Sequence, residues 1–383
     1  MTVFHCDGFE AYGNKADTGA NVETRINNTN RTQFAEISGG HSGGNVSLID
    51  DFQAEGLALE FPLTQSARGE WVIYEHPDGT GRHADYKVPT NASVPTLCVG
   101  FRFYNAAITP ASTITTTIFQ PMNGSSSAAF SLRIDANGVD LTLVDNDANT
   151  YTASDALSQG TWHYIEVEWK QTTIGNSPFC KVYVDGTLVI DESNIDLAGF
   201  TFFETWGMRI GVATSGGNQS DNGEFFAIDD VYEMEIDGVT HTAPLGSCRV
   251  MAYRPSSDDV PNDWTPSTGS DNFEMINDTN WGTGDYVDAT ATGNDDHYGL
   301  TADVSPAIDT IHGARIDVAC VAVDGTPTLH IGFDDGTADE QSMGVIGTGT
   351  DVGRQVFFEV DPSDNPWTET NFNAIEATQR MTE

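Results

Sequence analysis

Two pairs of carboxylates, each separated by a single residue, are the features of this sequence most able to do chemistry. Glu166 and Glu168 form one pair, and Glu233 and Glu235 form the other, with Asp237 at the same spacing. On a β-strand such residues point to one face, where two carboxyl groups could act as acid and nucleophile on a glycosidic bond. Neither stretch has a third acid at the spacing that a glycosidase strand requires, so we expect both to be solvated strand faces.

Other catalytic signatures are missing from the sequence. It contains no G-x-S-x-G turn and no H-E-x-x-H helix, and the Gly-rich segments 39–44 and 347–353 lack the Lys-Ser/Thr of a phosphate-binding loop. The histidines are dispersed, and we expect His41, His76, His83 and His163 to be surface or strand residues. The sequence therefore predicts no catalytic residues, no cofactor-binding residues and no enzyme.

Exposed aromatic side chains could instead form a platform on which sugar rings stack. Because tryptophan is highly buried on average, we expect most of them to be core residues. The residues considered are Trp71, Tyr74, Trp206, Trp264, Trp281 and Trp367.

Asp145, Asp147 and Asn149 imitate the start of a calcium-binding EF-hand loop. No glycine occupies the sixth position, and Ala156 stands where the bidentate glutamate is required. We therefore interpret this stretch as a hairpin turn. The five cysteines lie far apart without metal-ligand spacing, which is typical of buried free thiols in a reducing cytoplasm.

Short β-strands must position all of these residues, because runs rich in Val, Ile, Thr, Phe and Tyr alternate with polar residues between turn residues. Residues 128–153 predict a three-stranded meander with its first turn at Gly138, and residues 160–192 predict a further strand and then a hairpin that turns at Asp185-Gly186. Within that strand, His163 to Trp169 alternate between a buried and a charged face. Helical periodicity is limited to single turns near 153–158 and 369–377.

The chain has 383 residues, which favours two domains. We predict an all-β protein of two jelly-roll-like β-sandwiches, spanning residues 1–240 and 241–383. The 16 basic residues against 57 acidic ones give a net charge of −41, which disfavours nucleic-acid binding. The sequence starts without a signal peptide and has no apolar stretch long enough for a membrane helix, so we expect no membrane insertion.

The stretch from Phe130 to Asp191 resembles laminin-G-like and concanavalin A-like sandwiches. It carries a G-x-W-H-x-I-x-V strand, from Gly160 to Val167, and then a V-Y-V-D-G-x-L-V hairpin, from Val182 to Val189. The resemblance implies a β-sandwich. Glycosidases of this type carry E-x-D-x-x-E on one strand, and no stretch here matches it.

A second resemblance is to bacteriophage and prophage virion proteins. It rests on AIDDVYEMEIDG, LGSCRVMAYRPSSDD and DWTPSTGSDNFEMIND in succession, and on the ending around Pro366-Trp367-Thr368. It implies a non-enzymatic structural protein of the virion, tail-associated or capsid-decorating, assembled in the bacterial cytoplasm. Its expected partners are other virion proteins, further copies of itself in a homo-oligomer, and a host-surface glycan. The alternative is a virion-associated glycan depolymerase.

The start Asp7-Gly8-Phe9-Glu10 and the closing Ile228-Asp229-Asp230-Val231 together resemble carbohydrate-binding and adhesion sandwiches. This resemblance implies a structural Ca²⁺ site. In those proteins an N-terminal glutamate and the first aspartate of a closing I-D-D-V strand help to hold the ion. The matching residues here are Glu10 and Asp229, with Asp7 as a further ligand. The alternative is that these residues are exposed acids at strand ends.

Overall fold

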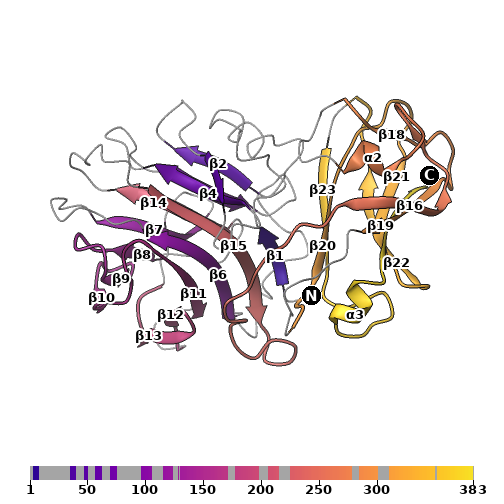
Figure 1. Ribbon diagram of the computed structural model, residues 1–383. Helices are drawn as coiled ribbons and strands as arrows, with labels where there is room; N and C mark the ends of the chain where they lie inside the picture. Colours follow the sequence, from indigo (N-terminus) through magenta and orange to yellow (C-terminus); the bar gives the residue numbers. More distant parts are fainter. Residues whose placement is uncertain are drawn as a thin grey trace. The chain divides into compact units, whose positions relative to one another are not determined.

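The protein is described from a computed structural model (Figure 1). The described residues are 3–7, 35–39, 47–50, 57–62, 70–75, 96–105, 115–123, 128, 130–170, 177–197, 206–214, 225–277, 284–300, 310–349 and 352–382. The chain divides into two compact units, and the first ends at Val250 while the second begins at Met251. The sequence placed this boundary at residue 240, before the segment that joins the two units.

The first unit is a sandwich of two antiparallel sheets, as expected from the alternating pattern. Eight of its described strands form one sheet in the order β13-β12-β11-β6-β15-β4-β3, with β1 also paired to β15. Their bounds are β1 Val3–Asp7, β3 Ser47–Asp50, β4 Leu57–Pro62, β6 Thr96–Asn105, β11 Thr161–Lys170, β12 Phe179–Val184, β13 Thr187–Ser193 and β15 Phe225–Ile236.

The second sheet of this unit has seven described strands in the order β10-β9-β8-β7-β14-β5-β2. Their bounds are β2 Ala35–Gly39, β5 Glu70–Glu75, β7 Thr116–Asn123, β8 Ser131–Ile134, β9 Leu141–Val144, β10 Thr150–Ala153 and β14 Trp206–Thr214. The strands β8, β9 and β10 pair in succession and confirm the predicted meander, and β11, β12 and β13 pair in succession in the other sheet. Asp185 and Gly186 both have positive φ at the β12–β13 turn, 50° and 76°, as the Asp-Gly sequence predicts.

The core of the first unit contains alternate residues of these strands. Val167, Val182, Val184 and Ile228 are buried in it, as the sequence indicated. Trp169 is the central tryptophan, with its ring against Phe119 and Phe130. The sequence predicts Trp162 or its neighbours in this core, and the neighbour His163 is buried while Trp162 is partly buried and contacts Tyr104. The reason is parity, because Trp162 and Trp169 stand an odd number of residues apart on β11 and point to opposite faces.

The second unit is also built from antiparallel sheets. A five-stranded sheet has the order β16-β19-β24-β21-β22, and β17-β18 and β20-β23 form two smaller sheets. The bounds are β16 Pro255–Asn262, β17 Thr265–Pro266, β18 Val287–Asp288, β19 Asp295–Leu300, β20 Ala314–Cys320, β21 Thr328–Asp334, β22 Ala338–Val345, β23 Val352–Phe358 and β24 Glu376–Thr382.

Helix is confined to single turns in the described part of the chain. The helix α3, Glu369–Phe372, begins at the capping box of Thr368 and Asn371 and confirms the predicted turn near residue 369. The helix α2, Phe273–Ile276, was not predicted. In the core of the second unit, the ring of Trp367 contacts Phe333 and Phe372, and its Nε1 donates to the carbonyl of Phe358 at 2.9 Å.

Candidate functional site

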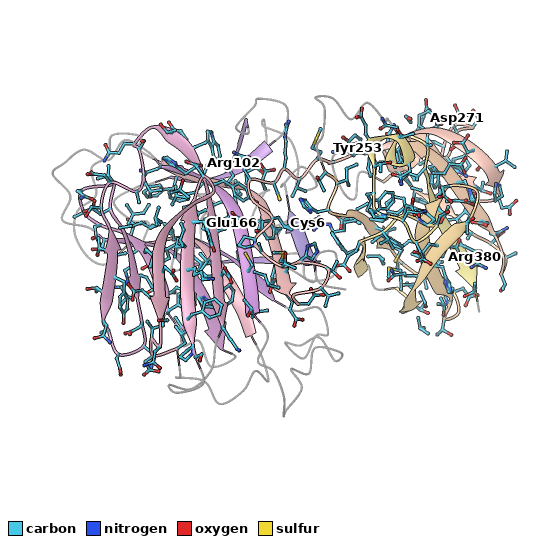
Figure 2. All side chains as sticks on the ribbon, turned by 90° about the horizontal axis from the view of Figure 1, so that it is seen from below. Cys6, Arg102, Glu166, Tyr253, Asp271 and Arg380 are labelled. Atoms are coloured by element: carbon cyan, nitrogen blue, oxygen red, sulfur yellow. The ribbon has the colours of Figure 1, made fainter. Side chains whose placement is uncertain are left out.

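Among the described residues, a group of buried polar side chains lies on the outer face of the eight-stranded sheet, opposite the core. Neighbouring residues of β11, β6 and β15 supply it, because alternate positions of each strand point away from Phe101, Ile165 and Val167. We call this group the polar face, and its members are Cys98, Arg102, Tyr164, Glu166, Glu168, Asp230 and Tyr232. Figure 2 labels Arg102 and Glu166.

A segment from the end of the first unit covers part of this face. Its residues Leu245–Val250, which we call the strap, bind side chains of the sheet through their backbone. The N–H of Gly246 donates to Glu166 Oε1 at 2.8 Å, and the N–H of Leu245 donates to the Tyr232 hydroxyl at 3.2 Å. Val250 N–H donates to Asp230 Oδ1 at 2.8 Å. The strap is therefore fixed by side-chain acceptors on two strands.

Arg102 joins the same strap to the sheet from β6. Its Nε lies 2.8 Å from Asp230 Oδ2, and its Nη2 donates to Ser247 Oγ and to the carbonyl of Cys248, both at 3.2 Å. The guanidinium also lies over the ring of Tyr164 at 5.3 Å from its centroid. A planar group with several donors suits such a position, because one side chain can bind a carboxylate, a hydroxyl and a carbonyl together.

Glu166 is the buried acid at the centre of the polar face. Its side chain accepts from the Tyr232 hydroxyl and from Gly246, and only 2% of the residue is exposed. Burial raises the pKa of the Glu166 carboxyl, and the two hydrogen bonds lower it by less. Glu168, two residues along the strand, is also buried and contacts Lys181 and the Tyr183 hydroxyl.

The burial of Glu166 and Glu168 contradicts the sequence prediction. They were expected on a solvated strand face, and that expectation is wrong because both side chains are buried. The strap covers Glu166, while Lys181 and Tyr183 of β12 lie against Glu168. A carboxyl with a raised pKa beside a second carboxylate is an arrangement that can transfer a proton to a substrate. Glu166 Oε1 already accepts hydrogen bonds from the Tyr232 hydroxyl and the Gly246 N–H.

A β-bulge in β15 precedes the second predicted acid pair, Glu233 and Glu235, and the expected solvated face is wrong for Glu233, which is buried. Asp229 lies opposite Arg102 and Tyr232 lies opposite Gly100, so β15 has one residue more than β6 in this interval. Asp230, at φ 50°, lies in that interval. The extra residue reverses the alternation, which turns Tyr232 outward and Glu233 inward beside Val99. Glu233 is therefore buried, its Oε1 has no hydrogen-bond partner, and burial raises its pKa to about 8.

His163, which was expected as a surface or strand residue, is a buried strand residue with a defined contact. Its Nδ1 lies 2.7 Å from Asp185 Oδ2, and its Nε2 accepts the N–H of Ser158 at 2.8 Å. Asp185 also accepts the N–H of Tyr164 through its other oxygen. The W-H strand and the D-G hairpin that carry the laminin-G resemblance are thus joined directly by their histidine and aspartate.

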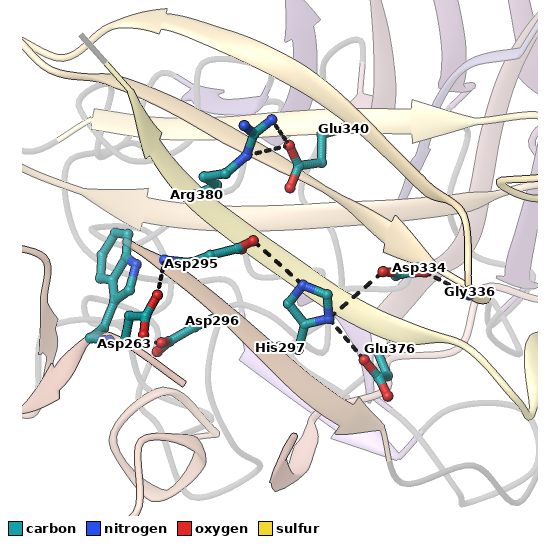
Figure 3. A network of polar contacts seen from close by, with 10 residues as sticks. Asp263, Asp295, Asp296, His297, Asp334, Gly336, Glu340, Glu376 and Arg380 are labelled. Atoms are coloured by element: carbon teal, nitrogen blue, oxygen red, sulfur yellow. Dashed lines mark hydrogen bonds and ion pairs between the residues drawn. The ribbon is translucent and has the colours of Figure 1, made fainter. Parts of the chain in front are cut away.

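In the second unit, His297 forms the centre of an ionic network on the five-stranded sheet (Figure 3). Its Nδ1 lies 2.9 Å from Glu376 Oε2 and 3.8 Å from Asp334 Oδ2, while its Nε2 lies 3.7 Å from Asp295 Oδ2. These contacts connect β19 with β21 and β24. Arg380 of β24 pairs with Glu340 of β22 on the same sheet. Together these contacts join β19, β21, β22 and β24.

A second polar network in this unit surrounds Asp296. This buried carboxylate accepts from the backbone N–H of Trp264 at 2.8 Å and from Asn272 Nδ2 and the Tyr298 hydroxyl at 2.7 Å. Gln379 donates to the Tyr298 hydroxyl in turn. Because each donor comes from a different segment, Asp296 fixes the irregular stretch after β16 against the sheet.

The predicted aromatic platform is only partly described. Trp367 is buried in the second core, and Trp264 packs against the same core, as expected of most tryptophans. Trp281 lies outside the described residues, and the side chains of Trp71, Tyr74 and Trp206 do as well. The Asp145 stretch forms the predicted hairpin turn, in which Asp145 Oδ1 accepts the N–H of Asn149.

Of the predicted calcium ligands, Asp7 and Asp229 lie on strands that pair with each other. The register places Asp7 opposite Val231, so the two segments are adjacent, as the prediction required. Asp229 is 1% exposed, and its Oδ1 accepts the N–H of Asp230. Glu10 lies outside the described residues. Within the described part of the chain, no group of three His, Cys, Asp or Glu side chains is arranged to hold a metal ion.

Comparisons with known proteins bear on the fold alone. No family model matches the chain, and no curated protein does. Similar solved structures include an endo-1,3-β-glucanase from Streptomyces sioyaensis (13% identity, 61% of this chain and 96% of that one, TM-score 0.41). An alginate lyase has 12% identity over 60% of this chain and 95% of its own (TM-score 0.36). The binding domain of botulinum neurotoxin serotype D has 15% identity over 52% of this chain (TM-score 0.33), and the chain spans 42% of its length.

These similarities correct one conclusion from the sequence. The absence of catalytic motifs was taken to mean that the protein is not an enzyme. That inference is wrong, because the proteins of similar fold include alginate lyases, a glucanase and a glycoside hydrolase family 131 catalytic domain. The β-sandwich is found both in glycan-active enzymes and in toxin binding domains. Among the described residues, no helix is long and apolar enough to cross a membrane.

Proposed function

We propose that the protein is a structural component of a bacteriophage particle, tail-associated or capsid-decorating, whose first sandwich contacts a host-surface glycan. One observation carries the proposal. Two of the sequence segments on which the virion resemblance rests, I-D-D-V and L-G-x-x-R-V, contact each other, because Asp230 accepts the N–H of Val250. The closing strand β15 and the segment that packs on it therefore depend on each other, which gives a physical reason for their joint occurrence in the sequence.

The proposed partners follow from the use of such a protein in a particle. Virion components are assembled in symmetric multiples, so we propose a homo-oligomer in contact with other virion proteins. The net charge of −41 keeps the surface from binding the packaged nucleic acid. Buried carboxylate, hydroxyl and guanidinium groups on the polar face are of the kinds that bind sugar hydroxyls.

Cryo-electron microscopy of the purified phage particle tests this function. We expect density for two linked β-sandwiches at a symmetric position, with a copy number set by that symmetry. A parallel measurement is mass spectrometry of purified particles, in which peptides of this chain should appear in constant ratio to the major capsid protein. Particles that contain none of the chain would refute the proposal.

A second candidate function is a virion-associated glycan depolymerase, which is favoured by one observation. Glu166, with a pKa raised by burial, and Glu168 lie on the same face of β11. Reducing ends should be measured after incubation with host polysaccharide, for the unaltered protein and for Glu166→Gln and Glu168→Gln. Turnover that either substitution abolishes would establish the enzyme. Equal signals with and without the protein would eliminate it.

A further inference from the structure

The strap is held differently from a strand of the sheet beneath it. The backbone N–H groups of Leu245, Gly246 and Val250 donate to side chains, namely the Tyr232 hydroxyl and the carboxylates of Glu166 and Asp230. Arg102 binds the middle of the strap at Ser247 and Cys248. A segment held in this way depends on the charge and position of a few side chains.

Closure of the strap has an electrostatic cost that is concentrated at Glu166. The carboxyl lies out of water and receives hydrogen bonds from neutral donors, the Tyr232 hydroxyl and the Gly246 N–H. Arg102, the arginine of the polar face, binds Asp230. The charged and titratable groups around Glu166 are Cys98 and Arg102 on β6, Tyr164 and Glu168 on β11, Lys181 and Tyr183 on β12, Asp230 and Tyr232 on β15, and Cys248 and Arg249 on the strap.

We propose that Leu245–Val250 is a pH-responsive strap, which closes over the polar face when Glu166 is protonated and lifts when Glu166 ionises. This device goes beyond the proposed function, since it operates whether or not the polar face has a ligand. When the strap is closed, it occupies the atoms of Glu166 and Arg102 that a ligand would need. Any molecule that binds there must displace it.

The direction of the pH effect follows from linkage. Burial raises the pKa of Glu166 by more than its hydrogen bonds from Tyr232 and Gly246 lower it, and the strap supplies part of that burial. The closed state therefore binds a proton more tightly than the open state. Rising pH therefore favours opening, starting at the ordinary pKa of a glutamate and continuing up to the raised one. One proton changes the opening equilibrium by at most about tenfold per pH unit in that window. Burial keeps the pKa of the Cys98, Tyr164 and Tyr232 groups well above their ordinary values, so those groups stay neutral there.

Hydrogen exchange of the strap amides, resolved by mass spectrometry on the full chain, tests the device. Rates measured from pH 5 to pH 9 are divided by the intrinsic exchange rate at each pH to give protection factors. For the unaltered protein, we expect protection of the segment containing Leu245 and Gly246 to fall as the pH rises and then to level off. Amides of β11, measured in parallel, report the stability of the whole first unit, so a strap that opens locally should be less protected than they are at every pH.

Three substitutions at two positions of β11 distinguish a strap linked to Glu166 from a general effect of charge. Glu166→Gln keeps an acceptor for Gly246 and removes the ionisable group, so strap protection should become independent of pH. Glu168→Gln removes a neighbouring buried charge that does not touch the strap, and it should keep the pH dependence of the unaltered protein. Glu166→Ala removes the acceptor and should lower strap protection at every pH.

Three results would overturn the proposal. Strap protection of the unaltered protein that does not change with pH would show that closure is not linked to a proton. A pH dependence that persists in Glu166→Gln would assign the linkage to another group, such as Asp230. The same flattening in Glu168→Gln as in Glu166→Gln would indicate a general response of the sheet.

Discussion

The ring of Tyr232 lies directly on Gly100 of the neighbouring strand. The two residues are opposite each other in the β6–β15 register, and a Cβ on Gly100 would overlap ring atoms of Tyr232. The absence of a side chain at Gly100 therefore lets the tyrosine lie flat, stacked against Tyr164 with ring centroids 6.4 Å apart. This position directs the Tyr232 hydroxyl toward Glu166 and Leu245.

Gly100→Ala should consequently destabilise the first unit and loosen the strap. Overpacking of a close contact costs about 1–3 kcal/mol, so we expect a lower midpoint in urea or heat denaturation. Tyr232→Phe is the matched variant, because it keeps the ring and removes the hydroxyl. If the midpoint of Gly100→Ala equals that of the unaltered protein, the close contact of Gly100 with Tyr232 is refuted.

Glu233 should make the stability of the first unit depend on pH. Its folded pKa of about 8 lies above the ordinary glutamate value, so the folded state binds the proton more tightly. Its contribution to stability is fully present below the ordinary value and is lost as the pH rises to about 8, by up to about 1.4 kcal/mol per pH unit. Glu233→Gln should therefore raise the melting temperature at pH 8 and change it little at pH 4. An equal difference at both pH values would contradict the assignment.

Val184→Asp tests the core assignment of the first unit. Val184 belongs to the core and is 5% exposed, so an aspartate there would place an unpaired carboxylate in the interior. The cost is several kcal/mol against a total stability of about 5–15 kcal/mol, and we expect the unit to unfold. Thr187→Asp, at an exposed position on the next strand, is a control for charge. A soluble Val184→Asp protein with an unchanged melting temperature would show that the assignment is wrong.

Asp296→Asn tests the polar network of the second unit. The substitution replaces one carboxylate oxygen by a donor, which opposes the donors of Trp264, Asn272 or Tyr298. An unmatched buried polar group costs about 1–3 kcal/mol, so thermal unfolding of the second unit should shift to lower temperature. Asp271→Asn, at an exposed position in the same unit, should leave it unchanged. Equal shifts for both variants would argue against the network.

The strands and hairpins between β8 and β13 could be predicted because their signals are local. Alternation places Ile165 and Val167 on one face, and Asp185-Gly186 marks a turn without reference to the rest of the chain. The cover over Glu166 could not be predicted in this way. Gly246 lies 80 residues further along the chain, and alternation on β11 carries no information about which distant segment packs on its polar face.

The burial of Glu233 shows a second limit of sequence patterns. Strict alternation from Ile228 would place Glu233 on the outer face, whereas the bulge at Asp229–Tyr232 turns it inward. The Asp-Asp step gives a weak hint, because aspartate tolerates the positive φ that Asp230 adopts. In the second unit, β19 begins in an acidic stretch that lacks strand-forming residues, and for that reason the His297 network was missed.

The structural calcium site stays a prediction, with one geometric requirement now described. Asp7 and Asp229 lie on adjacent strands, β1 and β15, so a cation at this edge would join the start of the first unit to its closing strand. Buried carboxylate oxygens such as those of Asp229 are hard donors of the kind Ca²⁺ prefers, and the −41 chain gains when clustered acids are neutralised.

Calcium should therefore raise the melting temperature of the first unit, and a chelator should lower it. An ion that binds the folded chain alone stabilises it by about 2.7 kcal/mol at a hundredfold excess over Kd. Magnesium should substitute poorly, because it requires a tighter octahedral shell than carboxylates from two strands provide. Glu10→Gln and Asp229→Asn should each reduce the calcium-dependent shift, while Asp237→Asn, at the exposed end beyond β15, should keep it. A full shift in Asp229→Asn would place the ion elsewhere, and no shift in the unaltered protein would leave these acids without a metal.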